Sequence, residues 1–221
     1  MGLSKVILDL LFPPKCAFCR SPLRSGEKGM CARCACSLPF IEGADRHMRG
    51  EFFEDCASPL RYAGRVRSSL LRFKFGGATA NAEAYAPILA DCIRTELAGK
   101  YDFITWVPLS KKRETDRGYD QSMLLAMAVA LELGTVAVSM LRKDTDVPAQ
   151  SSIRGREKRR ANVADVYSVT DPELVNGRRI LIIDDIVTTG ATLSECARTL
   201  LTAGAASVCC AALARAENEG D

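Results

Sequence analysis

Residues 178–193 read RRILIIDDIVTTGATL and carry the strongest structural signal in the sequence. The four apolar residues from Ile180 to Ile183 predict a buried strand. Asp184 and Asp185 follow at the expected carboxyl end of this strand, and a short loop then leads into a predicted helix. Because ligands bind at the carboxyl ends of the strands in open α/β sheets, the stretch predicts a binding site as well as a strand.

The loop after the two aspartates has the composition of an anion-binding turn, with the residues Thr188, Thr189, Gly190, Ala191 and Thr192. Backbone N–H groups at the start of a helix, together with threonine hydroxyls, attract an anion, and a glycine lets the backbone approach a phosphate closely. Carboxylates beside such a loop would repel a bare phosphate, so a ligand that also offers hydroxyl groups, such as a ribose 5-phosphate, fits better. The alternative is an ordinary strand–turn–helix with threonine caps, which would leave two neighbouring carboxylates desolvated without a partner.

The sequence around this stretch predicts an α/β fold. Short apolar runs occur at residues 103–107, 135–139, 180–183 and 207–213, and helical patterns lie at 122–133 and 192–203, with Gly204 at the expected C′ position. Alternating strands and helices indicate a mostly parallel sheet flanked by helices, and we assign it to a domain spanning residues 57–221. Residues 1–56 are predicted to form an N-terminal helix, packed on the body rather than anchored in a membrane, and a small irregular module.

Two CxxC pairs, Cys16–Cys19 and Cys31–Cys34, characterise the N-terminal module. Four thiolates at this spacing predict a closed structural zinc site, although free thiols and disulfides remain alternatives. Cys36 and Cys56 are further candidate ligands, whereas the remaining four cysteines are expected to be small buried hydrophobic residues: Cys92, Cys196, Cys209 and Cys210. His47, the single histidine, lies in a charged segment and is expected to be exposed to solvent.

Length and composition favour a cytoplasmic protein. The chain has 221 residues, 48% hydrophobic residues and a net charge of +3, which fits one domain with a small appendage and does not by itself mark a nucleic-acid-binding protein. We find neither a signal peptide pattern nor the run of about 20 apolar residues that a membrane span needs. The sequence therefore predicts a cytoplasmic protein with reduced thiols and no membrane insertion.

The 178–193 stretch resembles the fingerprint of type I phosphoribosyltransferases, in which an apolar strand, two acidic residues and a Thr-Thr-Gly-x-Thr loop follow one another. The resemblance implies that Asp184 and Asp185 hold the ribose 2- and 3-hydroxyls of phosphoribosyl pyrophosphate. It likewise implies that the loop from Thr188 to Thr192 holds the 5-phosphate.

Other segments extend the resemblance to nearly the whole chain, namely the two CxxC pairs, LLRFKFGG at 70–77, VPLSKKR at 107–113 and RGYDQ at 117–121. Together they resemble the ComF family, amidophosphoribosyltransferase-like proteins associated with competence and DNA uptake. Three departures from the family pattern occur, and they involve four residues. Asp120 stands where asparagine is usual, Ser110 where histidine is frequent, and Ser151-Ser152 where an Ala-Gly pair is common.

The basic residues suggest how the leaving group would be held. Lys111, Lys112 and Arg113 would receive the pyrophosphate together with Mg²⁺. The segment from residue 142 to 163, which includes Gln150 and Arg154 as further substrate-binding candidates, is either a hood that closes over the site or a solvated helix face.

Three functions remain open at this point. The first is an enzyme that transfers a phosphoribosyl group to an acceptor that the sequence does not identify. The second is a single-stranded DNA-binding component of the DNA-uptake machinery, in which the aromatic residues Tyr62, Phe73 and Phe75 would stack on bases unless they are core residues of a hairpin strand. The third is a sensor that binds phosphoribosyl pyrophosphate without turning it over.

Overall fold

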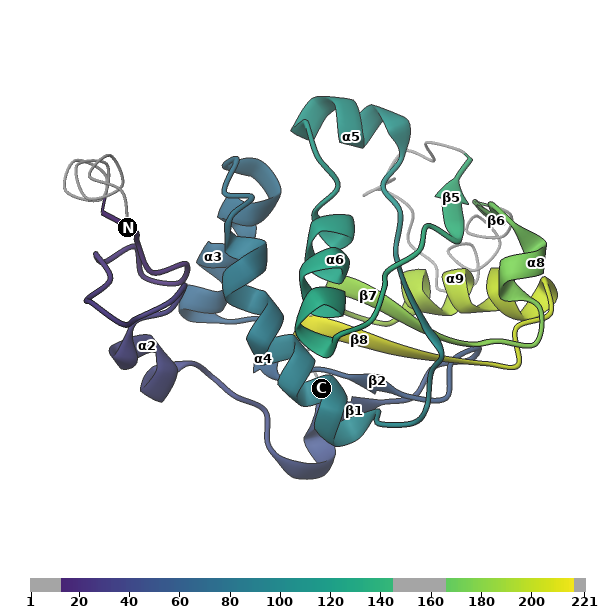
Figure 1. Ribbon diagram of the computed structural model, residues 1–221, viewed down its shortest axis with the longest axis horizontal. Coiled ribbons are helices and arrows are strands. Elements are labelled where there is room, and N and C mark those ends of the chain that lie inside the picture. Colours follow the sequence, from purple (N-terminus) through teal and green to yellow (C-terminus); the bar gives the residue numbers. More distant parts are fainter. Residues whose placement is uncertain (1–12, 145–165, 217–221) are drawn as a thin grey trace, which may run out of the picture.

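A computed structural model describes residues 13–144 and 166–216 of the chain and shows a central, mostly parallel sheet. Its strands lie in the order β1-β2-β8-β7-β4, and β3 also pairs with β8 (Figure 1). The strands are β1 (His47–Met48), β2 (Cys56–Ala57), β3 (Leu60–Arg61), β4 (Phe103–Trp106), β7 (Arg179–Val187) and β8 (Ser207–Arg215). Every pair is parallel except β1–β2, so the predicted α/β fold is confirmed.

The strands form where the apolar runs predicted them, with two corrections. β7 continues to Val187, so Asp184 and Asp185 lie inside the strand and not after its end; Asp184 still pairs with Ala212 of β8. The run 135–139 forms only an isolated parallel bridge between Ala137 and Ile104. Beyond this bridge, Met140 donates its backbone N–H to the side-chain hydroxyl of Thr105 at 3.3 Å and not to a backbone carbonyl.

Helices cover both faces of the sheet. On one face α3 (Gly64–Phe75), α4 (Asn81–Glu96) and α6 (Gln121–Leu133) pack over Leu181 and Ile183. On the other face α9 (Ala191–Thr202) packs over Ile180 and Ile182. An antiparallel pair, β5 (Leu141–Lys143) and β6 (Tyr167–Val169), lies beside α9, and the short helix α8 (Pro172–Val175) follows β6. The helix α5 (Lys111–Arg117) precedes α6. The alternation of side chains along β7 therefore fills two separate cores.

The N-terminal module, residues 13–46, contains α2 (Ala32–Ser37) and the 3-10 helix η1 (Gly43–Arg46) and packs against α3 and α4 (Figure 1). Arg72 and Ser69 of α3 both donate hydrogen bonds to the carbonyl of Ala17, at 2.8 and 2.5 Å. The ring of Phe18 lies 5.6 Å from that of Tyr85. The predicted division between residues 56 and 57 stays a prediction about domains; in space it falls inside β2, which pairs with β8.

His47 is not exposed as expected, because two carboxylates enclose its ring. Its Nδ1 lies 2.9 Å from Asp55 Oδ2 and its Nε2 lies 3.0 Å from Glu96 Oε2, and one third of the side chain remains exposed. Lys100 and Arg46 complete this charged cluster through the same two carboxylates. The partner residues come from the β1–β2 connection and from α4, so local sequence gave no indication of them.

Residues 64–75 form a helix and not a hairpin strand, so the aromatic side chains of this segment divide by helical geometry. Phe73 is buried, whereas Phe75 is 68% exposed. The predicted helix in the first eleven residues, and most of the predicted hood with Gln150 and Arg154, lie outside the described residues. Within the described ranges, no helix has the length and apolar character needed to cross a membrane.

Candidate functional site

The two aspartates of β7 are held by side chains from two helices. Ser122, at the start of α6, donates its hydroxyl to Asp184 Oδ1 at 2.9 Å, and the backbone N–H of Asp185 donates to the same oxygen at 2.8 Å. Lys74, near the end of α3, places its Nζ 3.1 Å from Asp185 Oδ2, and the Asp185 side chain is only 3% exposed. The acidic pair thus carries one buried ion pair and one hydroxyl donor.

Burial controls the charge of this pair. Burial and, after it, the negative charge of Asp185 raise the pKa of Asp184 to about 8, although Lys74 and the two hydrogen bonds oppose the shift. At neutral pH Asp184 therefore retains its proton in most molecules. A buried carboxyl group with such a raised pKa favours binding of a cation or a hydroxyl-bearing ligand that can take the place of the proton.

The loop after β7 adopts the shape of an anion-binding turn. Gly190 is the N-cap of α9 with φ of 75°, in the left-handed region that favours glycine. Thr188, Thr189, Ala191 and Thr192 are exposed around it. The first N–H groups of a helix have no backbone acceptor within the helix. Here the Ala191 N–H donates to the Thr189 hydroxyl at 3.4 Å, a long bond that an anion could replace at this turn.

A second constraint on Gly190 comes from the segment between β1 and β2. A Cβ atom at this position would lie 2.9 Å from Met48 Cε and 3.3 Å from the ring of Phe53. The same segment contacts the first turn of α9, because the Phe52 N–H donates to the hydroxyl of Ser194 at 3.3 Å. The loop is thus supported from behind by residues more than 130 positions away, a contact that the sequence did not reveal.

The predicted pyrophosphate residues lie on α5. Lys111, Lys112 and Arg113 form its exposed first turn, and Ser110 is its N-cap, with its hydroxyl accepting from the Arg113 N–H at 3.4 Å. The departures from the family pattern at Ser110 and Asp120 therefore serve as caps. Asp120 is the N-cap of α6 and accepts backbone N–H groups from both Met123 and Leu109 at 3.0 Å.

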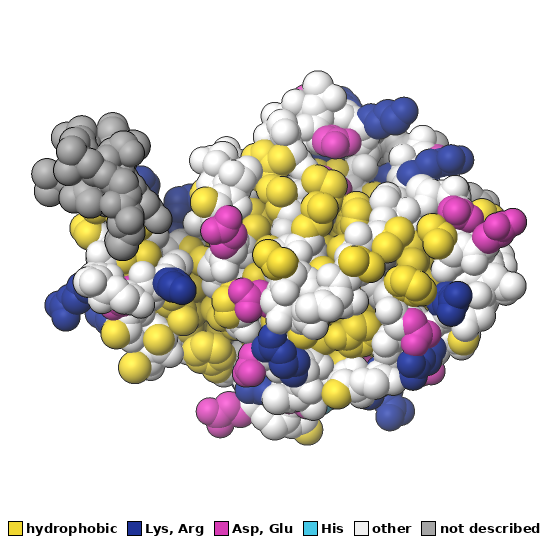
Figure 2. Space-filling view, viewed as in Figure 1, with side chains coloured by type: hydrophobic (Ala, Val, Ile, Leu, Met, Phe, Trp, Pro, Cys, Tyr) yellow, Lys and Arg dark blue, Asp and Glu magenta, His cyan; other side chains and the backbone are white. Residues whose placement is uncertain are grey.

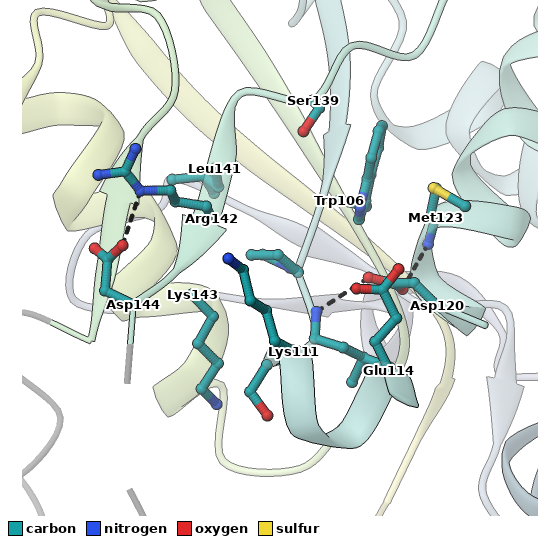
Figure 3. A pocket seen from close by; sticks show the side chains of 13 residues that line it. Trp106, Lys111, Glu114, Asp120, Met123, Ser139, Leu141, Arg142, Lys143 and Asp144 are labelled. Atoms are coloured by element: carbon teal, nitrogen blue, oxygen red, sulfur yellow. Dashed lines mark hydrogen bonds and ion pairs between the residues drawn. The ribbon is translucent and has the colours of Figure 1, made fainter. Parts of the chain in front are cut away.

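A cavity of about 540 Å³ lies between this segment, the start of α6 and β5. Figure 3 shows Arg142 on one side, Trp106 and Asp120 on the other, and Lys111 between them. The acidic pair is not among the residues that line the cavity. The structure therefore places Lys111 beside the base of the predicted hood, whereas the aspartates lie on β7 and the 188–192 loop leads into α9, outside the lining of this cavity.

Four cysteines of the N-terminal module form a compact cluster. The sulfur atoms of Cys16, Cys19, Cys31 and Cys34 all lie within 4.8 Å of one another, and Cys19 Sγ is 3.6 Å from Cys31 Sγ. Tetrahedral zinc with Zn–S bonds of about 2.3 Å separates its sulfur ligands by about 3.8 Å, so this donor set fits a structural zinc ion. Cys36 is exposed and Cys56 is buried in β2, and neither belongs to the cluster.

Two partners of the acidic pair were not assigned to it from sequence. Lys74 stood out only as part of the LLRFKFGG segment, and Ser122 only as part of a helix. They lie 111 and 62 residues from the aspartates they contact, and no periodic pattern reports a contact at such separation. In the sequence, the indication that Lys74 belongs to the site was its place in the LLRFKFGG segment, which contributes to the family resemblance.

Comparisons with known proteins agree with this arrangement. The chain matches the phosphoribosyl transferase domain over residues 120–220 and the double zinc ribbon domain over residues 7–64. It is 28% identical over 222 residues to the DNA utilization protein YhgH of Escherichia coli (strain K12), covering 90% of this chain and 96% of that protein.

Two further relatives carry competence names. Competence protein ComFC of Bacillus subtilis is 30% identical over 145 residues, covering 66% of this chain and 57% of that protein. Competence protein F of Haemophilus influenzae is 24% identical over 223 residues, covering 91% and 97%. The chain is therefore a homologue of proteins named for DNA utilization and competence, and it joins a double zinc ribbon domain to a phosphoribosyl transferase domain of the type I fold.

Proposed function

We propose that this protein binds phosphoribosyl pyrophosphate together with Mg²⁺ at the acidic pair and the 188–192 loop, and transfers the phosphoribosyl group to an acceptor. The observation that carries the proposal is the arrangement on β7 and α9. Two aspartates in a buried setting stand immediately before a glycine-capped helix start. A ligand with vicinal hydroxyls a few ångströms from a phosphate satisfies both features at once.

Each group of residues has a distinct role in this proposal. Asp184 and Asp185 accept hydrogen bonds from the ribose hydroxyls, and the backbone N–H groups at the start of α9 donate to the 5-phosphate. Lys111, Lys112 and Arg113 hold the pyrophosphate as negative charge grows on it. Bound Mg²⁺ supplies further positive charge to the pyrophosphate.

Displacement of pyrophosphate needs little acid–base chemistry from the protein. The bond between C1 of the ribose and the pyrophosphate oxygen breaks with its electron pair leaving on pyrophosphate, while the acceptor forms a bond to C1. Placement of the ribose and stabilisation of the leaving charge therefore account for most of the catalysis. We place the reaction in the cytoplasm, because clustered thiols bind zinc only while they stay reduced.

The test is isothermal titration of phosphoribosyl pyrophosphate with Mg²⁺ into the zinc-loaded protein, beside an Asp184→Asn, Asp185→Asn double variant. We expect the double variant to bind at least tenfold more weakly, because an amide accepts hydrogen bonds from the ribose hydroxyls less strongly than a carboxylate does. Asp102→Asn is the matched control, since Asp102 pairs with Arg179 at the opposite end of β7. Absence of binding by the intact protein would reject both the transferase and the sensor.

The sensor and the transferase are distinguished by pyrophosphate release. Binding that depends on the aspartates, followed by release in a screen of acceptors, identifies the enzyme. Intact ligand after prolonged incubation with every acceptor identifies the sensor.

The names of the relatives favour a second candidate, a component that handles single-stranded DNA. Figure 2 shows basic and acidic side chains interspersed among apolar ones on the face in view, so that face has no uniform positive potential. A DNA-binding role predicts affinity that falls steeply with salt and survives the double aspartate substitution. Fluorescence anisotropy of a labelled oligonucleotide at several salt concentrations tests this directly.

A further inference from the structure

The last turn of α3 presents two adjacent side chains to different surroundings. Lys74 reaches the buried carboxylate of Asp185 at 3.1 Å, whereas the next residue, Phe75, is 68% exposed. A single exposed apolar side chain is common on protein surfaces and needs no explanation by itself. The contacts around Phe75, however, indicate a specific role for this side chain.

The guanidinium of Arg117 lies over the ring of Phe75, with its Cζ 4.8 Å from the ring centroid. Gln121 holds Arg117 in place, because its Oε1 accepts from Arg117 Nη1 at 2.9 Å. The hydroxyl of Tyr119 donates to the carbonyl of Phe73, which ties the α5–α6 connection to the end of α3. The ring and the guanidinium are therefore fixed relative to each other.

The start of α6 repeats the pattern seen at the end of α3. Gln121 supports Arg117, and the next residue, Ser122, donates to Asp184 at 2.9 Å. In α3 the neighbour of the residue that contacts the acidic pair is Phe75 itself, and in α6 that neighbour is Gln121, which holds Arg117. This double connection places the exposed ring at the rim of the proposed ribose site.

We propose that Phe75 and Arg117 form a stacking platform for a planar, nucleobase-like ring of the acceptor; the inference rests on the proposed phosphoribosyl transfer. Aromatic rings and guanidinium planes are the two protein surfaces on which bases stack. Both occur here as a rigid pair beside the residues that would hold the ribose.

The transfer that follows is balanced in atoms and electrons. A ring nitrogen forms the bond to C1 of the ribose as the C1–O bond to pyrophosphate breaks, and the electron pair departs with pyrophosphate. The proton that the nitrogen loses passes to water. The ring can come from a free heterocycle or from a base in a single strand, since both present the same planar face.

The experiment uses Phe75→Trp as a fluorescent reporter, read as a difference from the native protein, whose tryptophan, Trp106, lines the separate cavity. The probes are free adenine, free uracil, a 20-mer of deoxythymidine and an abasic 20-mer, each with and without phosphoribosyl pyrophosphate and Mg²⁺. We expect quenching by free bases or by the thymidine oligomer, but not by the abasic one. Quenching by the free bases alone would identify a free heterocycle as the source of the ring. Quenching by the thymidine oligomer alone would identify a base within a single strand.

Affinity measurements on further variants separate stacking from general packing. We expect Phe75→Leu, which keeps the apolar volume, to weaken binding of the ring about tenfold, and Phe75→Tyr to retain it. Phe40→Leu is the matched control, because Phe40 is also exposed, at 39%, but belongs to the N-terminal module. Equal affinity of the Phe75→Leu and native proteins, or no base binding at all, overturns the platform.

The outcomes keep this inference distinct from the proposed function. Titration of phosphoribosyl pyrophosphate reports on the acidic pair and the loop, whereas ring binding reports on Phe75. If the pyrophosphate ligand binds and no ring does, the platform is rejected and the ligand site stands. If rings bind through Phe75 and the ligand does not, the transferase is rejected and the platform stands as a base-binding site.

Discussion

Replacing Asp184 with asparagine should alter how the stability of this protein depends on pH. In the folded chain, burial and the neighbouring Asp185 raise the pKa of Asp184 to about 8, from 3.8 for an unperturbed aspartate. Between about pH 4 and pH 8 the unfolded chain therefore loses this proton while the folded chain keeps it. Because the folded state binds more protons in this window, the free energy of unfolding falls as the pH rises.

The size of the effect follows from the same linkage. One full proton of difference changes the free energy of unfolding by about 1.4 kcal/mol per pH unit. Asp184 is partly accessible to water, and Lys74 opposes the shift. Between pH 6 and pH 8 we therefore expect the free energy of unfolding of the Asp184→Asn variant to rise, relative to that of the native protein, by on the order of 1–3 kcal/mol. Above the folded pKa of about 8 the difference should become constant.

The assay is urea unfolding of zinc-loaded protein at five pH values from 5 to 9, compared among the native protein, Asp184→Asn and Asp102→Asn. Hydrogen bonds from Arg179 lower the pKa of Asp102 to about 2, so its stabilising contribution is complete above about pH 4 and is lost only at lower pH. The free energy of unfolding of the Asp102→Asn variant should therefore differ from that of the native protein by a constant amount from pH 5 to pH 9. The pH dependence of zinc binding is common to all three proteins and cancels in the comparison.

The result that refutes this reasoning is specific. If the difference between Asp184→Asn and the native protein is flat from pH 5 to pH 8, Asp184 is already ionised in the folded state. The acidic pair would then carry its full negative charge at neutral pH, and Lys74 alone would have to balance it.

Three further predictions concern the parts around the acidic pair. Cys34→Ser should release zinc and lower the melting temperature, whereas Cys36→Ser should change neither; metal analysis and calorimetry check this. Gly190→Ala should lower the free energy of unfolding by more than Gly134→Ala, because both positions have φ near +70° but only Gly190 also meets Met48 and Phe53; equal losses in urea would contradict the contact. His47→Gln should lower the free energy of unfolding by about 1–3 kcal/mol, because it removes the hydrogen bonds of the ring to two carboxylates, and an unchanged urea midpoint would show that they contribute nothing.

The sequence predicted the parts of the fold that depend on local periodicity. The apolar runs of β4, β7 and β8 and the helical patterns of α6 and α9 all appear where expected. Short strands were invisible, because β1, β2 and β3 have two residues each and two residues show no alternation. β2 and β3 join the sheet by pairing with β8, which lies about 150 residues later, and β1 joins it by pairing with β2.

The candidate site could be predicted only where its residues are contiguous. The aspartates and the loop lie within nine residues of sequence, from 184 to 192, so a single pattern shows both. The contacts of Lys74 and Ser122 depend on the packing of α3 and α6 over β7. The expected exposure of His47 failed for the same reason, since Glu96 reaches it from α4.

The zinc module and the strand β1 that follows it lie far from the acidic pair in sequence, yet together they support both halves of the proposed site. Ala17, between the first two cysteines, fixes α3 through Ser69 and Arg72, and the same helix carries Lys74 to Asp185. Met48, which follows the module along the chain, packs behind Gly190 of the loop. Because neither contact involves a cysteine side chain, loss of zinc should weaken ligand binding by loosening α3 and not by removing a ligand contact.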